Sequence, residues 1–131
     1  MLVVKTFLKK TKNKGIGLFA AEDIKKGTIV HIDENFLDRE FSRKFVKKCK
    51  PLLREFIVKY GDYNSSSDSW SLSCDDARFM NHSETPNILW DSKKKTMFAI
   101  KSIKKGEEIV CDYRNICDEC RDSGIGFEVK A

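Results

Sequence analysis

The sequence has no long apolar run. No stretch approaches the roughly 18 consecutive apolar residues that a membrane-spanning helix requires, so we expect no membrane association. The first ten residues contain an apolar stretch of only three, Leu2–Val4, which is too short for the core of a signal peptide. The sequence therefore predicts an intracellular protein, cytoplasmic or nuclear, that is not secreted.

The chain also lacks a disulfide pattern and has little proline. It has five cysteines, an odd number, and no export signal, so we expect reduced thiols. Of its two prolines, Pro51 falls inside a helical pattern. Because proline has no backbone N–H, Pro51 should kink or divide that helix.

Basic residues outnumber acidic ones by 25 to 20, which gives a net charge of +5, and the excess lies in lysine pairs such as Lys104–Lys105. Such pairs could contact phosphates, so a nucleic-acid-binding protein is one alternative. Acidic residues are interspersed and no nucleic-acid-binding motif is present, so we interpret the lysines as a solvated surface and expect no nucleic-acid substrate. A basic histone tail would need a locally acidic groove on this protein.

The 131 residues, of which 40% are hydrophobic, suit one modest domain with an internal repeat. Residues 19–27 and 98–106 share Phe-Ala, Ile, Lys-Lys and Gly at identical spacing. Lys-Lys-Gly between apolar stretches indicates a turn, because glycine readily takes a positive φ. The sequence therefore predicts two similar strand–turn–strand units, one near each end of the chain.

One region between these units, residues 38–61, has helical periodicity. Its apolar residues are Phe41, Phe45, Val46, Cys49, Leu52, Leu53, Phe56, Ile57 and Tyr60. Asp38 is the candidate N-cap, and Gly61 stands where a helix commonly ends. Residues 64–69 are polar and serine-rich and predict a loop. Short β-prone runs lie at 2–7, 29–32, 88–90, 96–100 and 109–111, so the predicted class is mostly β with a helical insert.

Three segments have compositions suited to a functional site. Residues 14–20, Lys-Gly-Ile-Gly-Leu-Phe-Ala, form a glycine-rich turn that lets a ligand approach the backbone but lacks the pattern of a dinucleotide fold. Residues 78–87 read Arg-Phe-Met-Asn-His-Ser-Glu-Thr-Pro-Asn, and residues 106–113 read Gly-Glu-Glu-Ile-Val-Cys-Asp-Tyr. Taken singly, the second is a self-capping turn and the third a strand that ends in a half-buried tyrosine.

Together, in this order and spacing, the three segments resemble the signature of the SET-domain protein lysine methyltransferases, and the chain looks like a small, single-domain member. The resemblance spans residues 14–113 and implies short β-sheets with a C-terminal pseudoknot. It divides the chain into a SET domain at 1–116, with 38–61 as its insert, and a post-SET-like tail at 117–131. It also implies methyl transfer from S-adenosyl-L-methionine to the side-chain amine of a lysine in a protein or peptide substrate, with a histone as one candidate.

The resemblance implies roles for individual residues. Tyr113 would be the catalytic residue, beside the transferred methyl group. The cofactor would be bound by Lys14, Gly15, Ile16, Gly17, Asn81, His82, Tyr63 and Phe127. Tyr60 competes with Tyr63 for its role, and Phe127 would cover the adenine. The substrate lysine would be bound by Cys111, Tyr113 and Phe79.

Two features depart from the family pattern. Many histone-directed members bind zinc through tail cysteines, whereas Cys117-Asp118-Glu119-Cys120 is only half of a tetrahedral site. We expect free thiols and no metal; the alternative is a site completed by Cys111 or by a second subunit in a homodimer. At Cys111 the family usually has Phe or Tyr, so a roomier amine pocket and a di- or trimethylated product are implied.

The alternative function is a SET-like module that binds a peptide or the cofactor without catalysis. Tyr113, Asn81 and His82 are all present, which favours the enzyme. The chemistry needs no metal, because a lysine with an ordinary pKa of about 10.4 becomes a nucleophile once burial favours its neutral amine.

Overall fold

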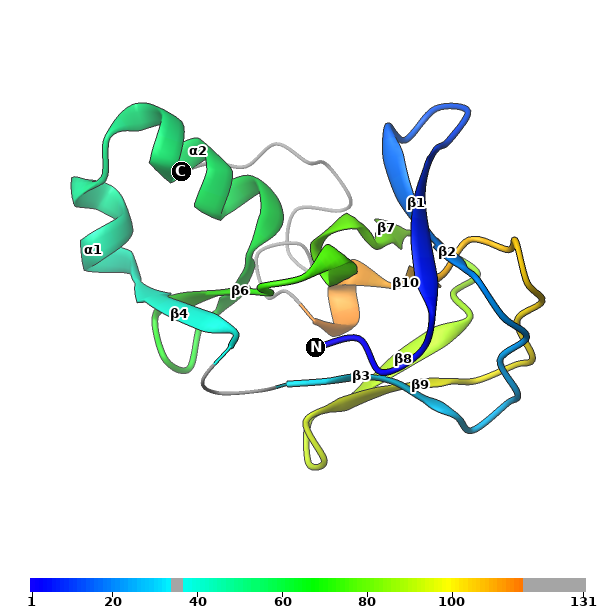
Figure 1. Ribbon diagram of the computed structural model, residues 1–131. Coiled ribbons are helices and arrows are strands. Elements are labelled where there is room, and N and C mark those ends of the chain that lie inside the picture. Colours follow the sequence, from blue (N-terminus) through cyan, green and yellow to red (C-terminus); the bar gives the residue numbers. More distant parts are fainter. Residues whose placement is uncertain (34–36, 117–131) are drawn as a thin grey trace.

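The computed structural model describes residues 1–33 and 37–116 (Figure 1). Its elements, in chain order, are β1 (Thr6–Lys10), β2 (Ile16–Ala20), β3 (Ile29–Ile32), β4 (Arg39–Ser42), α1 (Arg43–Lys48), α2 (Pro51–Tyr60), β5 (Asp62–Asn64), β6 (Ser69–Leu72), the 3-10 helix η1 (Asp76–Phe79), β7 (Asn81–His82), β8 (Ile88–Asp91), β9 (Thr96–Ala99), β10 (Val110–Cys111) and the 3-10 helix η2 (Tyr113–Asn115). Within these residues the strands form four small sheets, β1-β2, β10-β7, β3-β9-β8 and β4-β6-β5. The predicted class is confirmed.

The two copies of the internal repeat pair with each other. Gly27 and Gly106 both have a φ of +87°, which confirms the predicted turns. The Gly27 N–H donates to the Ala99 carbonyl and the Gly106 N–H donates to the Ala20 carbonyl, each over 2.7 Å. Ile24 and Ile103 form an antiparallel bridge between the copies. Each repeat therefore supplies the hydrogen-bond partners that the turn of the other repeat requires.

The main hydrophobic core takes residues from both repeats and from the strands on either side of them. Leu18, Val30, Ile88, Ile103 and Ile109 are fully buried in it. Cys111 and Met80 belong to the same core, and Tyr113 lies against it, half-buried. The third sequence motif therefore ends on a rigid, closely packed support.

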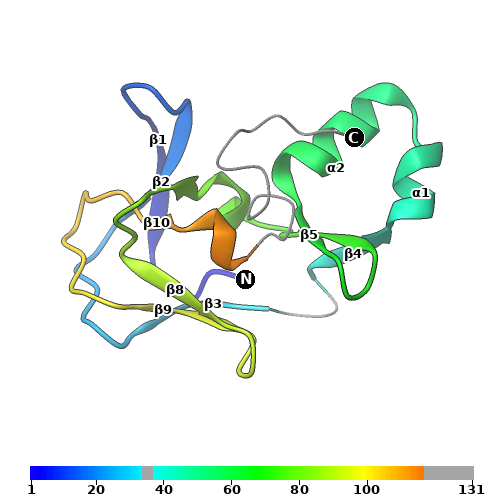
Figure 2. The ribbon, with the colours of Figure 1, turned by 180° about the vertical axis from the view of Figure 1, so that it is seen from behind.

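The helical insert forms a second unit to one side of the other sheets (Figure 1, Figure 2). Strand β6 pairs antiparallel with both β4 and β5. The two helices and this sheet enclose a smaller cluster of buried residues, Val46, Ile57, Val58, Tyr63 and Trp70. The insert thus has its own apolar cluster, although it is short.

The N-terminal part of the insert differs from its prediction. Helix α1 is capped by Ser42, whose side chain accepts from the Phe45 N–H over 3.2 Å, and residues 39–42 are strand β4. The prediction that Asp38 is the N-cap is therefore wrong; its carboxylate accepts from the Cys74 N–H instead, over 3.2 Å. The four residues of β4 fit both a helical and a strand pattern, and they form a strand because they pair with β6. Pro51 begins α2, which confirms that it divides the segment.

Gly61 ends α2, but not in the left-handed conformation common at helix ends. Its φ is −96°, and its N–H donates to the Ile57 carbonyl over 2.8 Å. A Cβ atom at this position would lie 2.6 Å from the Ile57 oxygen and 3.0 Å from the Ser71 oxygen. The close approach of β6, rather than a positive φ, is what requires glycine here.

Other boundaries shift slightly. The predicted strand at 2–7 is right only at its end, because β1 begins at Thr6 and Leu2 makes a single bridge to His31. The predicted loop at 64–69 is a turn over 65–68 that joins β5 to β6. The other four predicted strands agree with β3, β8, β9 and β10 to within one residue. Among the residues described, no helix is long and apolar enough to cross a membrane.

Candidate active site

The second and third sequence motifs lie side by side in a parallel ladder. Val110 is the partner of Asn81, and Cys111 is the partner of His82. The buried side chain of Asn87 fixes this arrangement: its amide donates to the Glu108 carbonyl over 2.8 Å, and its oxygen accepts from the Val110 N–H over 2.9 Å. The Asn87 side chain therefore forms hydrogen bonds to the backbone as a neighbouring strand would, and it aligns the third motif with the second.

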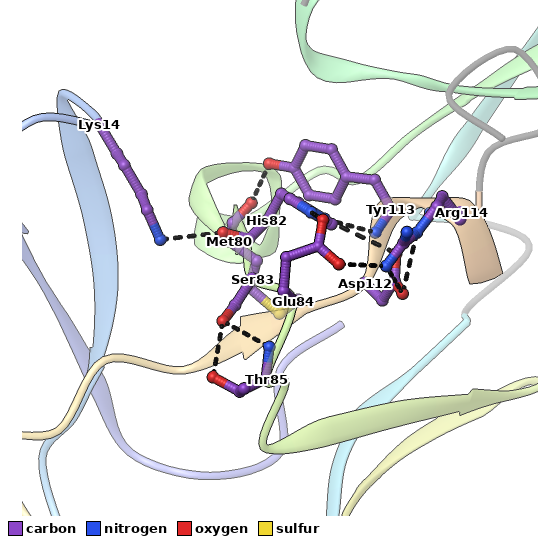
Figure 3. A network of polar contacts seen from close by, with 9 residues as sticks. All are labelled: Lys14, Met80, His82, Ser83, Glu84, Thr85, Asp112, Tyr113 and Arg114. Carbon is purple, nitrogen blue, oxygen red and sulfur yellow. Dashed lines mark hydrogen bonds and ion pairs between the residues drawn. The ribbon is translucent and has the colours of Figure 1, made fainter. Parts of the chain in front are cut away.

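Tyr113 follows this ladder directly, at the start of η2. Its hydroxyl donates to the Met80 carbonyl oxygen over 2.5 Å, and its ring centroid lies 5.5 Å from that of His82 (Figure 3). Because the hydroxyl hydrogen is committed to Met80, the Tyr113 oxygen acts as an acceptor toward any other group. An acceptor suits a positively charged centre such as a sulfonium methyl or an ammonium group.

His82 is held from both ring nitrogens. Its Nδ1 accepts from the Tyr113 backbone N–H over 3.2 Å, so the hydrogen of the neutral ring is on Nε2. Nε2 then donates to Glu84 over 3.3 Å (Figure 3). The imidazole thereby joins the second motif to the residue that ends the third. The backbone carbonyl of His82 accepts a hydrogen bond from the ammonium of Lys14, in the glycine-rich turn, over 2.9 Å.

Arg114 forms ion pairs with one carboxylate of the second motif and one of the third. Its guanidinium donates to Asp112 through Nε over 2.8 Å and through Nη2 over 2.7 Å, and the same Nη2 donates to Glu84 over 2.7 Å. Hydrogen bonds from Arg114 hold the pKa of Asp112 below its usual range. Hydrogen bonds from His82 and then Arg114 lower the pKa of Glu84 in the same way. Both carboxylates therefore stay ionised beside Tyr113 at neutral pH.

The glycine-rich turn lies against the second motif, and its two glycines have different roles. Gly15 has a φ of +74°, and no atom lies within 4 Å of where its Cβ would be, so its backbone is open on that side. A Cβ on Gly17 would lie 2.6 Å from the Glu108 carboxylate and 3.0 Å from the Asn81 amide. The Asn81 amide donates to Glu108 over 2.7 Å and to the Ile16 carbonyl over 3.2 Å. Gly17 therefore permits close contact with the protein itself, whereas the Gly15 backbone is open on one side.

The remaining predicted site residues are dispersed. Phe79 lies against Tyr60, with ring centroids 5.7 Å apart. Tyr63 is buried in the cluster of the insert, where its ring contacts Trp70 and its hydroxyl donates to Asp68 over 2.6 Å. Of the two tyrosines considered for the cofactor, Tyr60 is thus the one in contact with a predicted substrate residue. Phe127, Cys117 and Cys120 lie outside the described residues.

Cys111 is almost fully buried, at 3% exposure, on the strand that leads to Tyr113. Burial raises the pKa of its thiol, and the charges of Asp62 and Asp112 add to the effect. The thiol is therefore neutral at physiological pH. It acts as a small apolar group rather than a nucleophile.

Sequence reasoning assigned no role to Glu108, Asp112 or Arg114. The signal for the first two was present, because both lie within the third motif, and Arg114 follows it directly. Glu108 contacts Asn81, 27 residues away in the chain, and Arg114 contacts Glu84, 30 residues away. These contacts are therefore visible only in the folded structure. In residues 1–33 and 37–116, no group of three or more His, Cys, Asp or Glu side chains is arranged to hold a metal ion.

The chain is similar to known proteins in sequence and in fold. The chain matches the family model for the SET domain over residues 15–114. A relative from Saccharomyces cerevisiae, a histone-lysine N-methyltransferase specific for H3 lysine-36, is 30% identical over 115 residues, which cover 79% of this chain and 15% of the relative. The chain thus spans about 15% of the length of that relative.

Solved structures share the fold. The Neurospora SET domain protein DIM-5, a histone lysine methyltransferase, matches with a TM-score of 0.56 at 22% identity, over 86% of this chain and 53% of that chain. The complex ctPRC2, in an autoinhibited conformation bound to S-adenosylmethionine, matches with a TM-score of 0.62 at 24% identity, over 92% of this chain and 16% of that chain. The family model covers most of this sequence and both structures share its architecture; the chain therefore belongs to the SET-domain family.

Proposed function

We propose that this protein transfers a methyl group from S-adenosylmethionine to the side-chain amine of a lysine in a protein substrate. Family membership and histone-lysine methyltransferase relatives at about 30% identity support the kind of reaction. The cofactor is proposed from the family and from the ligand of ctPRC2. A histone is one candidate substrate, carried over from the same relatives.

The residues around the glycine-rich turn and Asn81 fit this cofactor chemically. A methionine moiety carries an ammonium and a carboxylate, for which Glu108 and Lys14 are suitable partners. The carbonyls of Ile16 and His82, which accept from the Asn81 amide and the Lys14 ammonium, are candidate backbone acceptors, and the open side of Gly15 allows close approach. Lys14 would have to release the His82 carbonyl before adenine could use it.

The chemistry then follows from these groups. S-adenosylmethionine, when bound, supplies an electrophilic methyl whose bond to sulfur breaks with the electron pair remaining on sulfur. The substrate lysine must arrive as the neutral amine, and burial next to Tyr113 favours that form by lowering the lysine pKa. The Tyr113 oxygen, held by Met80, would orient the amine and stabilise developing positive charge. Positioning of this kind can contribute about 7–11 kcal/mol in ideal cases.

One observation carries the proposal: the hydrogen bond from Tyr113 to Met80 aims the hydroxyl oxygen of the third motif at the segment that continues into Asn81 and His82. A transfer assay with isotope-labelled cofactor tests it, on a panel of histones, non-histone proteins and lysine peptides. Label in a lysine of any substrate supports the enzyme. Cofactor binding without transfer to any member of the panel would favour the non-catalytic module instead.

The nucleus is the proposed place of action, because the relatives modify histones. The sequence also allowed a cytoplasmic location, which the relatives do not support. A homodimer remains a separate prediction, to be tested by the mass of the protein in solution.

A further inference from the structure

The positive charge of the chain is concentrated on the two helices of the insert. Residues 43–60 hold seven basic residues, Arg43, Lys44, Lys47, Lys48, Lys50, Arg54 and Lys59, against a single acidic one, Glu55. Their net charge of +6 exceeds the +5 of the whole chain, so all other residues together carry −1. The lysines are therefore not an evenly solvated surface, and the insert is an electrostatically distinct face.

The same helices expose large apolar side chains. On α2, Ile57 and Val58 face the cluster of the insert, whereas Leu52 is 80% exposed, Leu53 48% and Phe56 42%. Phe45 on α1 is 49% exposed. Several large apolar groups on one short helix pair are more than the scattered exposure normal for a surface, and they indicate a binding face. Leu52, Leu53 and Phe56 share one side of α2 by their spacing, and we call these three residues the apolar face of the insert.

The helix pair presents this face in a fixed geometry. The Arg54 guanidinium donates to the Lys47 carbonyl over 2.7 Å and to the Cys49 carbonyl over 3.2 Å. An arginine of α2 thereby binds the carbonyls at the end of α1. Both helices also contribute to the buried cluster that contains Val46 and Ile57. A partner would meet a preorganised surface, which lowers the entropy cost of binding.

The apolar face continues toward Tyr113 through aromatic rings. The Phe56 and Tyr60 centroids are 5.1 Å apart, and those of Tyr60 and Phe79 are 5.7 Å apart. Phe79 precedes Met80, whose carbonyl accepts from Tyr113. A segment that covers the apolar face can therefore follow these rings as far as Phe79, the residue before the Met80 carbonyl that binds Tyr113.

The charge and the apolar side chains together indicate which kind of molecule binds this face of the insert. Nucleic acid would neutralise the lysines but leave Leu52, Leu53 and Phe56 in water. An anionic bilayer would cover both, but it would not use the aromatic continuation to Phe79. A protein segment that combines carboxylates with large apolar side chains matches all three features. A lysine-rich tail would be repelled by the same face.

We propose that the apolar face of the insert and its surrounding lysines dock an acidic, apolar segment of the protein substrate, next to the lysine that is methylated. This inference rests on the proposed function for the identity of the partner as a substrate. The docking itself requires neither cofactor nor turnover, so its failure and the failure of methyl transfer are distinguishable.

Fluorescence anisotropy with two labelled synthetic peptides tests the docking. Both peptides carry a single lysine flanked by leucine and phenylalanine at helical spacing; one has glutamates at its polar positions and the other has lysines there. We expect the glutamate peptide to bind at least about tenfold more tightly at low salt, with the difference reduced at high salt. Equal affinity for the two peptides would overturn the proposal.

Two double variants keep the fold while removing the face. Lys44→Glu with Lys50→Asp reverses charge at exposed positions where carboxylates favour helix starts, and Leu52→Ser with Leu53→Ser removes exposed apolar groups. Each should weaken the glutamate peptide about tenfold. The matched controls are Lys93→Glu with Lys94→Glu, in the exposed β8–β9 turn, and Ile29→Ser, at 43% exposure on β3.

The controls should bind as the parent does, and circular dichroism should show parental helix content in all variants. Controls that weaken binding equally would contradict a specific face. Phosphatidylserine–phosphatidylcholine vesicles and duplex DNA complete the set of probes. Tighter binding of either than of the glutamate peptide, lost in the same double variants, would assign the face to that partner and overturn the proposal.

Discussion

Tyr113 and Met80, 33 residues apart, are joined by a hydrogen bond of 2.5 Å from the phenol to the backbone carbonyl. The bond fixes the hydroxyl at the point where the second and third motifs meet, and it leaves the oxygen to act as an acceptor. A tyrosine held in this way contributes orientation and electrostatics rather than a labile proton. That role leads to the first prediction.

Tyr113→Phe should reduce methyl transfer by about 10²–10³-fold, the cost of removing one preorganised polar contact from a transition state. Cofactor affinity should stay within about twofold of the parental value, because the predicted cofactor contacts lie at residues 14–17, 63, 81, 82 and 127. Single-turnover transfer and calorimetry measure the two quantities. Transfer at the parental rate would remove Tyr113 from the catalytic role.

Asn81→Ala should weaken or abolish cofactor binding. The Asn81 amide ties the glycine-rich turn to Glu108, so its loss frees both the turn and the carboxylate predicted to hold the ligand. His82→Ala should act similarly, because it removes the imidazole that accepts from the Tyr113 N–H and donates to Glu84 and so positions the carbonyl predicted to meet adenine. Asn64→Ala, on β5 of the insert, is the matched control and should leave affinity unchanged. Calorimetry that finds parental affinity in both site variants would take the Asn-His segment out of the site.

The sequence predicted this site because its three motifs are local and specific. Their order and spacing located Lys14, Asn81, His82 and Tyr113, and the structure brings these residues or their backbones together. The ladder that aligns Asn81 with Val110 was not predictable, since it depends on contacts between segments about 30 residues apart. For the same reason the bridging role of Arg114 became visible only in the fold.

The insert was harder to predict because its pattern is ambiguous. Apolar spacing in residues 38–61 gave the helices and the break at Pro51 correctly, but it extended the helix over β4. Strand β4 exists because β6 offers it a hydrogen-bonding edge, and no local signal encodes that edge. The excess of basic residues in 43–60 can be counted in the sequence, but that these residues belong to two helices that contact each other is known only from the fold.

Cofactor specificity gives a third prediction. S-adenosylmethionine should raise the unfolding temperature of the protein, because a ligand that binds only the folded state stabilises it by mass action. NAD should not, since the Gly15–Gly17 turn leads into strand β2 rather than opening a helix, as a dinucleotide-binding turn would. Differential scanning fluorimetry at matched ligand concentrations measures both shifts. Equal stabilisation by NAD would contradict the assignment of the turn.

The ion pairs of Arg114 predict a pH-dependent contribution to stability. The pKa values of Asp112 and Glu84 are lowered in the folded state. Their contribution to the free energy of unfolding is therefore complete above the usual carboxylate pKa of about 4, and it is lost as the pH falls through the lowered pKa values. Arg114→Gln should therefore lower the free energy of unfolding at pH 7, and the difference from the parent should shrink on acidification. Both carboxylates are close to solvent, so the effect should be small and weakened by salt.

Urea unfolding of the parent and of Arg114→Gln at several pH values measures this difference. Lys93→Gln, in the exposed β8–β9 turn, is the control and should show no such convergence. A difference between parent and Arg114→Gln that stays constant from neutral to acidic pH would show that the ion pairs do not contribute through charge.

We expect Cys111 to influence the number of methyl groups transferred. The thiol is neutral, nearly buried and small, on the strand that ends at Tyr113, where the family usually has an aromatic residue. A tyrosine hydroxyl at this position can hold a water molecule that fills the space for further methyl groups; cysteine is smaller and only a weak donor. We therefore expect di- or trimethyl-lysine from the parent, and Cys111→Tyr should shift the product toward monomethyl-lysine.

Three variants separate space from hydrogen bonding at this position. Cys111→Ser keeps the volume small and should keep the parental product. Cys111→Phe fills the space without a hydroxyl, so it should still allow more methylation than Cys111→Tyr. Because the site is closely packed, unfolding temperatures must first show that the aromatic variants fold. Mass spectrometry at long reaction times, with excess cofactor, then counts methyl groups. A parent enzyme that stops at one methyl under these conditions would show that neighbouring side chains, and not Cys111, determine the room around the amine.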